Sequence, residues 1–225
     1  MKILFISNLS SNIADGLNWS VPSSVNAQSK YDDVLWVNTS EAFIEHWGEV
    51  KAYHNWRDFG EFDLNGFPDP FKCPDLVVFE GFNFIRHAIF SKTLRKKQIP
   101  YIIIPRGSLT FKAQHNHSRY KKVIANILFL DSFVKNALAI QFLTKGERDN
   151  SIGYNQLQNY ILPNGFDDPC VYKETFSIDS IKATFIGRLD MYHKGLDMLL
   201  NVLEKNKEVL KKKQVPLVNI WSQAI

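Results

Sequence analysis

The chain has 225 residues, of which 45% are hydrophobic and 22% charged, and its mean hydropathy is −0.20. This composition is typical of a soluble globular protein and excludes a disordered or collagen-like chain. The 27 Lys and Arg residues outnumber the 23 Asp and Glu residues by only four, which is too few to indicate nucleic-acid binding. The two cysteines, Cys73 and Cys170, have neither a CxxC spacing nor a nearby His cluster, so we predict no zinc site and no disulfide framework.

The apolar runs are all short. None approaches the roughly 18 residues that a membrane-spanning helix needs, and the run 3–6 is too short for a signal-peptide core. We therefore expect a cytoplasmic protein with reduced thiols, and peripheral contact with the inner face of the membrane stays open.

Short β-branched runs, apolar at almost every position, are typical of strands that are buried on both faces of a sheet. They occupy residues 2–6, 33–37, 75–79, 101–104, 137–143, 160–162, 183–186 and 217–221. Segments with helical periodicity lie between them, at 40–47, 83–98, 117–135 and 196–213. This alternation predicts an α/β protein of the Rossmann-like kind, with a parallel sheet and crossover helices.

Two segments interrupt this rhythm. Residues 9–30 form a predicted loop after the first strand, where open α/β sheets bind ligands, and Gly16 is its only glycine. Neither GxGxxG nor GxxxxGK[ST] occurs, so we predict no dinucleotide fingerprint and no P-loop. We interpret the aromatic segment 49–74 as an irregular insertion that packs its own rings.

A turn signal at Pro163-Asn164-Gly165 divides the chain into two predicted domains, 1–165 and 166–225. After a polar connector the strand and helix pattern restarts, and it supplies a single βαβ unit before residue 225. One such unit cannot cover both faces of its sheet, so we expect the second domain to be incomplete.

Three motifs in this order resemble retaining glycosyltransferases of family 4. Residues 105–109 read PRGSL, residues 161–167 read ILPNGFD, and FIGRLD at 185–190 is followed by HKGLD at 193–197. The resemblance implies a GT-B fold, in which two Rossmann-like domains face each other across a cleft. The first would bind a glycan or lipid-linked acceptor, and the second, of which only the first βαβ part is present, would bind the nucleotide-sugar donor.

The resemblance assigns donor binding to Arg188 and Lys194. Two cations above a strand end can stabilise the negative charge that develops on a departing nucleoside diphosphate, although solvated loop cations are the alternative. Gly16 resembles a glycine that lets the backbone approach the donor phosphates, but the glycine pair frequent in the family is absent.

Arg106 stands where relatives carry a His or Arg that faces the transferred sugar or a phosphate. Asn164 and Gly165 either line the same cleft or form a turn. Lys121 and Lys122, with Arg119, lie on a predicted helix and either meet a lipid phosphate or form a solvated helix face.

Other titratable residues receive no role. His115 and His117 are interpreted as exposed histidines rather than metal ligands. Asp131 and Glu147 do not form an obvious acid and base pair, so the catalytic residues stay unknown. Apart from the nucleotide-sugar substrate, we expect no cofactor and no metal.

The resemblance stops near residue 213. The family carries a later pair of glutamates seven residues apart that holds the donor, whereas Glu204 and Glu208 are four apart on a helix and read as surface charges. The chain then ends in WSQAI where a glycine-rich turn is expected. We therefore expect a C-terminally truncated protein with impaired activity.

Three functions are compatible with the sequence. The first is sugar transfer from a nucleotide-sugar in bacterial surface polysaccharide synthesis, a setting that rests on the resemblance alone. The second is a non-catalytic sugar-binding or partner-binding fragment, which would bind a glycan without donor turnover. The third is a nucleotide-dependent oxidoreductase, which lacks its glycine fingerprint and would be excluded by the absence of nicotinamide binding.

Overall fold

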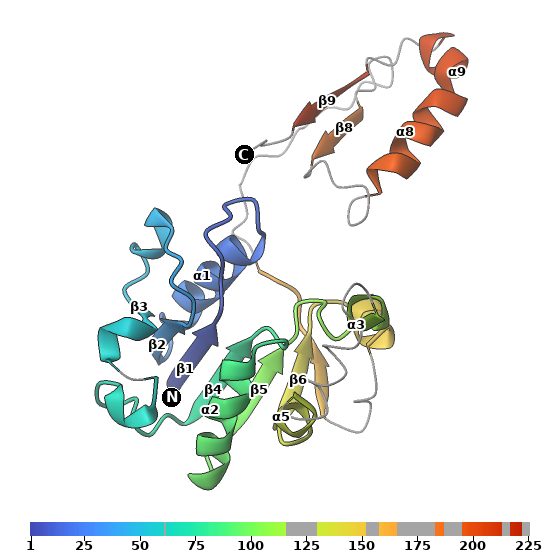
Figure 1. The fold of residues 1–225 in the computed structure, drawn as a ribbon. Helices are drawn as coiled ribbons and strands as arrows, with labels where there is room; N and C mark the ends of the chain where they lie inside the picture. Colours follow the sequence, from blue (N-terminus) through green and yellow to red (C-terminus); the bar gives the residue numbers. More distant parts are fainter. Residues whose placement is uncertain are drawn as a thin grey trace. The chain divides into compact units, whose positions relative to one another are not determined.

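A computed structural model describes residues 1–60, 62–115, 130–151, 158–165, 183–186, 195–212 and 217–221. The chain consists of two units, Met1–Phe166 and Asp167–Ile225 (Figure 1). Lys121, Lys122, Arg188 and Lys194 lie outside the described residues.

The first unit is built on a seven-stranded parallel sheet in the order β3-β2-β1-β4-β5-β6-β7. The strands are β1 Lys2–Ser7, β2 Asp33–Asn38, β3 Tyr53–Asn55, β4 Leu76–Glu80, β5 Tyr101–Ile104, β6 Ala139–Phe142 and β7 Asn159–Ile161. Helices alternate with the strands, so the predicted α/β, Rossmann-like class is confirmed. The described helices of this unit are α1 Leu17–Gln28, α2 Ile85–Lys96, α3 Phe111–His115, α5 Asp131–Lys135 and α6 Lys145–Asp149, with 3-10 turns η1 Glu45–Trp47, η2 Trp56–Phe59 and η3 Leu64–Gly66.

Both faces of the sheet are buried, which explains the continuous apolar runs. Leu4 and Ile6 of β1 join one core cluster, which includes Phe90 and Leu94 of α2. Alternate side chains of the same strand, Ile3 and Phe5, join a second cluster, which includes Val21 and Val25 of α1. In Figure 1, α2 lies over β4 and β5.

Three predicted elements need correction. The segment 9–30 contains helix α1, and the predicted helix at 40–47 is reduced to the 3-10 turn η1. The segment 49–74 packs its aromatic rings as predicted, with Phe59 and Phe67 5.1 Å apart between ring centroids, but it also contributes the edge strand β3. Of the predicted helix 117–135, only α5 falls within the described residues.

The second unit contains one βαβ arrangement. Strand β8, Ala183–Ile186, pairs in parallel with β9, Leu217–Trp221. Helices α8, Leu196–Lys205, and α9, Lys207–Lys212, connect them and meet at Asn206. Within the described ranges of both units, no helix combines the length and the apolar character needed to cross a membrane.

Candidate functional site

The candidate site lies where the strand order of the first unit changes direction. Strands β2 and β3 extend from one side of β1, whereas β4 to β7 extend from the other. Parallel α/β sheets bind ligands beyond the carboxyl ends of the strands at such a point. Ser7 at the end of β1 is in register with Glu80 at the end of β4, and Glu80 is in register with Ile104 at the end of β5.

A buried ion pair joins the ends of β4 and β5. Arg106 donates from Nε to Oε2 of Glu80 over 2.8 Å and from Nη2 to Oε1 over 3.1 Å. The two side chains are only 4% and 1% exposed. Burial raises the pKa of Glu80, and the facing guanidinium of Arg106 opposes that rise. The two-point geometry fixes the plane of the guanidinium as well as its position.

The backbone around this pair adopts left-handed conformations. Arg106 has φ 55° and is followed by Gly107 with φ 80°. A left-handed arginine is uncommon, and such conformations concentrate at functional sites. Gly81, directly after Glu80, has φ 99°, and a Cβ there would lie 2.5 Å from the ring of Phe84. A side chain is therefore excluded next to Glu80.

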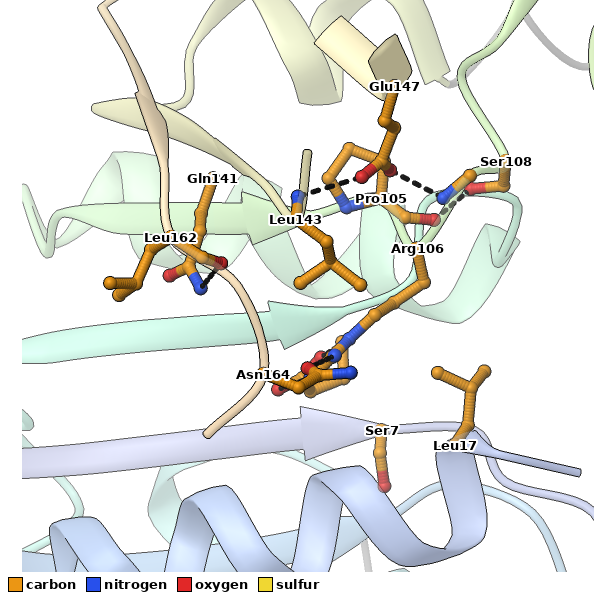
Figure 2. A network of polar contacts seen from close by, with 12 residues as sticks. Ser7, Leu17, Pro105, Arg106, Ser108, Gln141, Leu143, Glu147, Leu162 and Asn164 are labelled. Carbon is orange, nitrogen blue, oxygen red and sulfur yellow. Dashed lines mark hydrogen bonds and ion pairs between the residues drawn. The ribbon is translucent and has the colours of Figure 1, made fainter. Parts of the chain in front are cut away.

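Two residues from later segments of the chain complete the arrangement (Figure 2). Nη1 of Arg106 donates a hydrogen bond to Oδ1 of Asn164, which lies in the segment after β7. The carboxylate of Glu147 on α6 accepts from the backbone N–H of Gly107 over 2.5 Å and of Leu143 over 2.8 Å. Glu147 thus ties the turn that carries Arg106 to the end of β6.

Arg106 keeps hydrogen-bonding capacity for a ligand. A guanidinium has five N–H donors, and three of them point to Glu80 and Asn164, so two have no partner among the described residues. Because the carboxylate of Glu80 neutralises its charge, Arg106 would contact a ligand mainly through its oriented N–H donors and less through net positive charge. In Figure 2, Ser7 and Leu17 lie across from Arg106 and Asn164.

Ser7 is a structural residue of this edge. Its hydroxyl donates to Oδ1 of Asn38 over 3.1 Å and accepts from Nε1 of Trp36 over 2.8 Å. Oδ1 of Asn38 also accepts from the N–H of Leu9 over 2.8 Å. Since the hydroxyl is buried and bonded on both sides, it does not act as a nucleophile in this arrangement.

His87 of α2 lies fully buried near the ends of β1 and β4. Burial lowers its pKa from 6.5 to about 3, although the backbone of Ser7 and Gly81 opposes that fall. Its ring nitrogens make no hydrogen bond to any described residue, and its ring packs against Phe79 and Phe84. Because its ring is fully buried, we assign His87 no role in proton transfer.

The structure brings together two of the residues selected from the sequence, Arg106 and Asn164. Gly165 follows Asn164 and is exposed. Gly16 precedes α1 with φ −59°, a conformation open to any residue, and a Cβ there would meet no atom within 4 Å. The N–H groups of Leu17 and Asn18 donate hydrogen bonds to Asp15, so both are already paired within the protein.

Sequence reasoning assigned no role to Glu80 or Glu147. The signal for Glu80 is an acidic residue that ends a buried strand directly before a glycine. Glu147 stands three residues after Thr144, which caps α6 by accepting from the Glu147 N–H over 3.0 Å. Within the described part of the chain, no group of three His, Cys, Asp or Glu side chains could hold a metal, and the exposed His115 stacks on Phe111.

No protein-family model matches the chain, and no curated protein matches it. Solved structures with a similar fold include UDP-N-acetylglucosamine 2-epimerase from Rickettsia bellii, with 12% identity, a TM-score of 0.44 and coverage of 96% of this chain and 52% of that one. A second UDP-N-acetylglucosamine 2-epimerase has 10% identity and a TM-score of 0.48, with coverage of 100% and 69%. MurG from Acinetobacter baumannii has 10% identity and a TM-score of 0.47, with coverage of 100% and 66%.

The chain thus spans about half to two thirds of the length of these proteins. All three TM-scores lie below 0.5, so these similarities support no functional conclusion.

Proposed function

We propose that this chain is part of a retaining glycosyltransferase, which transfers a sugar from a nucleotide-sugar to a glycan or lipid-linked acceptor. The observation that carries the proposal is the hydrogen bond between Arg106 and Asn164, which are 58 residues apart. They belong to the PRGSL and ILPNGFD motifs, and the family resemblance assigns both motifs to one cleft. An arginine fixed at the carboxyl edge of the sheet, with two donors left, fits a ligand rich in oxygen acceptors.

The chemistry of the reaction gives each cation a different task. As the bond from the sugar to the nucleoside diphosphate breaks, negative charge collects on the leaving phosphate. In this proposal Arg188 and Lys194 stabilise that charge, and Arg106 orients a sugar or phosphate oxygen through its two remaining donors. Gly16 and Gly165 leave room for the ligand beside the backbone. The proposal names no catalytic base and no cofactor beyond the nucleotide-sugar itself.

The acceptor and its location are the finer part of the proposal. A lipid-linked acceptor would bring the protein to the inner face of the membrane, where Lys121 and Lys122 would meet lipid phosphates. Bacterial surface polysaccharide synthesis is the setting that the resemblance suggests.

Calorimetric titration of the purified chain with UDP-, GDP-, ADP- and dTDP-sugars tests this proposal. We expect saturable binding of the nucleotide-sugars that carry one of these bases. Asn164→Ala should bind them about tenfold more weakly, because the guanidinium of Arg106 loses a hydrogen-bond partner. Asn65→Ala is the matched control, since Asn65 is an exposed asparagine in a surface turn of the same unit, hydrogen-bonded to Asp63.

Two results would overturn the proposal. One is that no nucleotide-sugar binds while a glycan does, which would indicate a non-catalytic binding fragment. The other is that Asn164→Ala and Arg106→Lys both bind the donor as tightly as the unchanged protein.

A further inference from the structure

An exposed aromatic pair includes none of the residues of the Arg106 cluster. Trp19, in the first turn of α1, is 51% exposed. Its ring stacks on that of His46 from η1, with 4.2 Å between the centroids and 8° between the planes. Since α1 follows β1 and η1 follows β2, both residues lie on segments that follow the carboxyl ends of these strands.

Hydrogen bonds hold both rings in place. Nε1 of Trp19 donates to the carbonyl of Ile13 over 3.0 Å, and Nε2 of His46 lies 2.8 Å from the carbonyl of Asn18. A carbonyl only accepts, so Nε2 of His46 carries the proton and donates it. Nε1 of Trp47 donates to the same carbonyl over 3.0 Å. The stack is therefore fixed without a ligand.

The loop before α1 is fixed as well. Nδ2 of the buried Asn18 donates to the carbonyls of Ser10 and Asn12 over 2.8 and 2.6 Å. The N–H of Ala14 donates to Oδ1 of Asn12 over 3.0 Å. A rigid exposed tryptophan loses little conformational entropy when a ligand covers it.

We propose that Trp19, supported by His46, binds the apolar face of a neutral sugar ring. Its indole N–H is already bonded and one of its faces is stacked on His46, while about half of the residue is exposed, so in this proposal the ligand meets the other ring face. The C–H groups on one face of a pyranose carry partial positive charge and are attracted to that π-face. Asp15 stands four residues before Trp19 and the exposed Glu45 directly before His46, and carboxylates accept hydrogen bonds from sugar hydroxyls.

The same carboxylates argue against a nucleotide. A nucleobase could stack on Trp19, but the charged residues that adjoin the stack in the sequence, Asp15 and Glu45, are acidic and would not attract its phosphates. The described residues that adjoin the stack in sequence, 13–20 and 43–48, include no Lys or Arg. The role of Trp19 as an acceptor subsite rests on the proposed function. Binding of a sugar at Trp19 itself needs no nucleotide-sugar.

The test is an NMR titration of the indole N–H signals of the five tryptophans. The probes are maltotriose, chitotriose and mannotriose, and Trp19→Phe assigns the Trp19 signal. We expect one of these sugars to shift that signal saturably, Trp19→Ala to weaken binding about tenfold, and His46→Ala to weaken it less. Tyr31→Ala is the matched control, because Tyr31 is an exposed aromatic residue of the same unit.

The inference is overturned if none of the three sugars shifts the Trp19 signal, if Trp19→Ala binds as tightly as the unchanged protein, or if UDP shifts that signal instead. Failure here is distinguishable from failure of the proposed function. Donor binding is measured at Asn164 without an acceptor, and sugar binding is measured at Trp19 without a nucleotide.

Discussion

At the residue scale, Glu80 and Arg106 depend on each other. Their side chains are almost fully enclosed, so water compensates poorly for a lost partner. Glu147 acts one step further out, because it bonds the backbone of Gly107 rather than Arg106 itself. The site therefore consists of a buried pair and a carboxylate that holds the turn beside it.

Glu80→Gln tests the buried pair. We expect the free energy of unfolding, measured by urea denaturation, to fall by about 3–5 kcal/mol, because the guanidinium is left buried without a counter-charge. Glu41→Gln is the control, since it removes the carboxylate from an exposed pair with Arg57 and should change little. Equal effects of the two variants would mean that the enclosed pair contributes no more than a surface pair.

Glu147→Gln tests how the turn is held. The amide can accept only one of the two backbone hydrogen bonds well, so we expect a loss of about 1–3 kcal/mol in unfolding free energy. Hydrogen exchange at the Gly107 and Leu143 amides should accelerate. Asp149→Asn, on the same helix, should leave both amides as protected as before. Unchanged exchange in Glu147→Gln would refute the role given to this carboxylate.

At the element scale, the sequence predicts the strands far better than the helices and turns. Runs such as 33–37 and 101–104 are buried on both faces, so their apolar pattern alone identifies them. Helix α1 escapes prediction because its buried residues include Asn18 and Pro22, which interrupt the apolar stripe. Strand β3 escapes because its three residues are polar or aromatic and owe their structure to pairing with β2.

The candidate site is only partly predictable for a similar reason. The motif pattern selects Arg106 and Asn164, but nothing local pairs Arg106 with Glu80, 26 residues earlier in the chain. That pairing follows from strand order, which brings the ends of β4 and β5 together. Glu147 likewise binds the backbone of the left-handed turn at Arg106 and Gly107, and no sequence pattern predicts that turn.

Helix α2 places His87 where protonation opposes folding. Its pKa is about 3 in the folded protein and about 6.5 when exposed, so between these values only the unfolded chain takes up the proton. We therefore expect its contribution to the unfolding free energy to be constant above pH 6.5. As the pH falls from about 6 to about 3.5, that contribution should drop by up to about 1.4 kcal/mol per pH unit.

Comparison with His87→Gln isolates this effect. The variant lacks the imidazole, so its unfolding free energy should fall less steeply as the pH falls. His115→Gln is the control, because His115 is exposed. In the unchanged protein, the ring protons of His87 should keep their NMR shift from pH 8 to pH 4. A titration midpoint near pH 6.5 would show that the imidazole is open to solvent.

At the scale of the whole molecule, the described residues of the two units differ in the burial of their apolar side chains. Among the residues that the structure describes, both core clusters consist of residues from the first unit. The second unit presents exposed apolar side chains along α8 and α9, including Met198, Leu200, Val202 and Val209. We therefore expect the first unit to be stable through its own sheet and helices.

A chain ending at Phe166 should keep that stability. We expect residues 1–166 to unfold in one cooperative transition, within a few degrees of the main transition of the full chain, by calorimetry. The pair Glu80–Arg106 lies inside this fragment, so Glu80→Gln should destabilise it as it does the full chain. A fragment without a cooperative transition would show that the first unit needs residues beyond 166.

In the proposed function, Arg106 of the buried pair faces a nucleotide-sugar. The most direct measurement is the NMR signal of its Nε–H, which is bonded to Glu80, during titration of the full chain with the nucleotide-sugar identified by calorimetry. We expect a saturable shift of this signal with the same dissociation constant as that obtained from the heat of binding. An Arg106 signal that stays in place while the donor saturates the protein would contradict it.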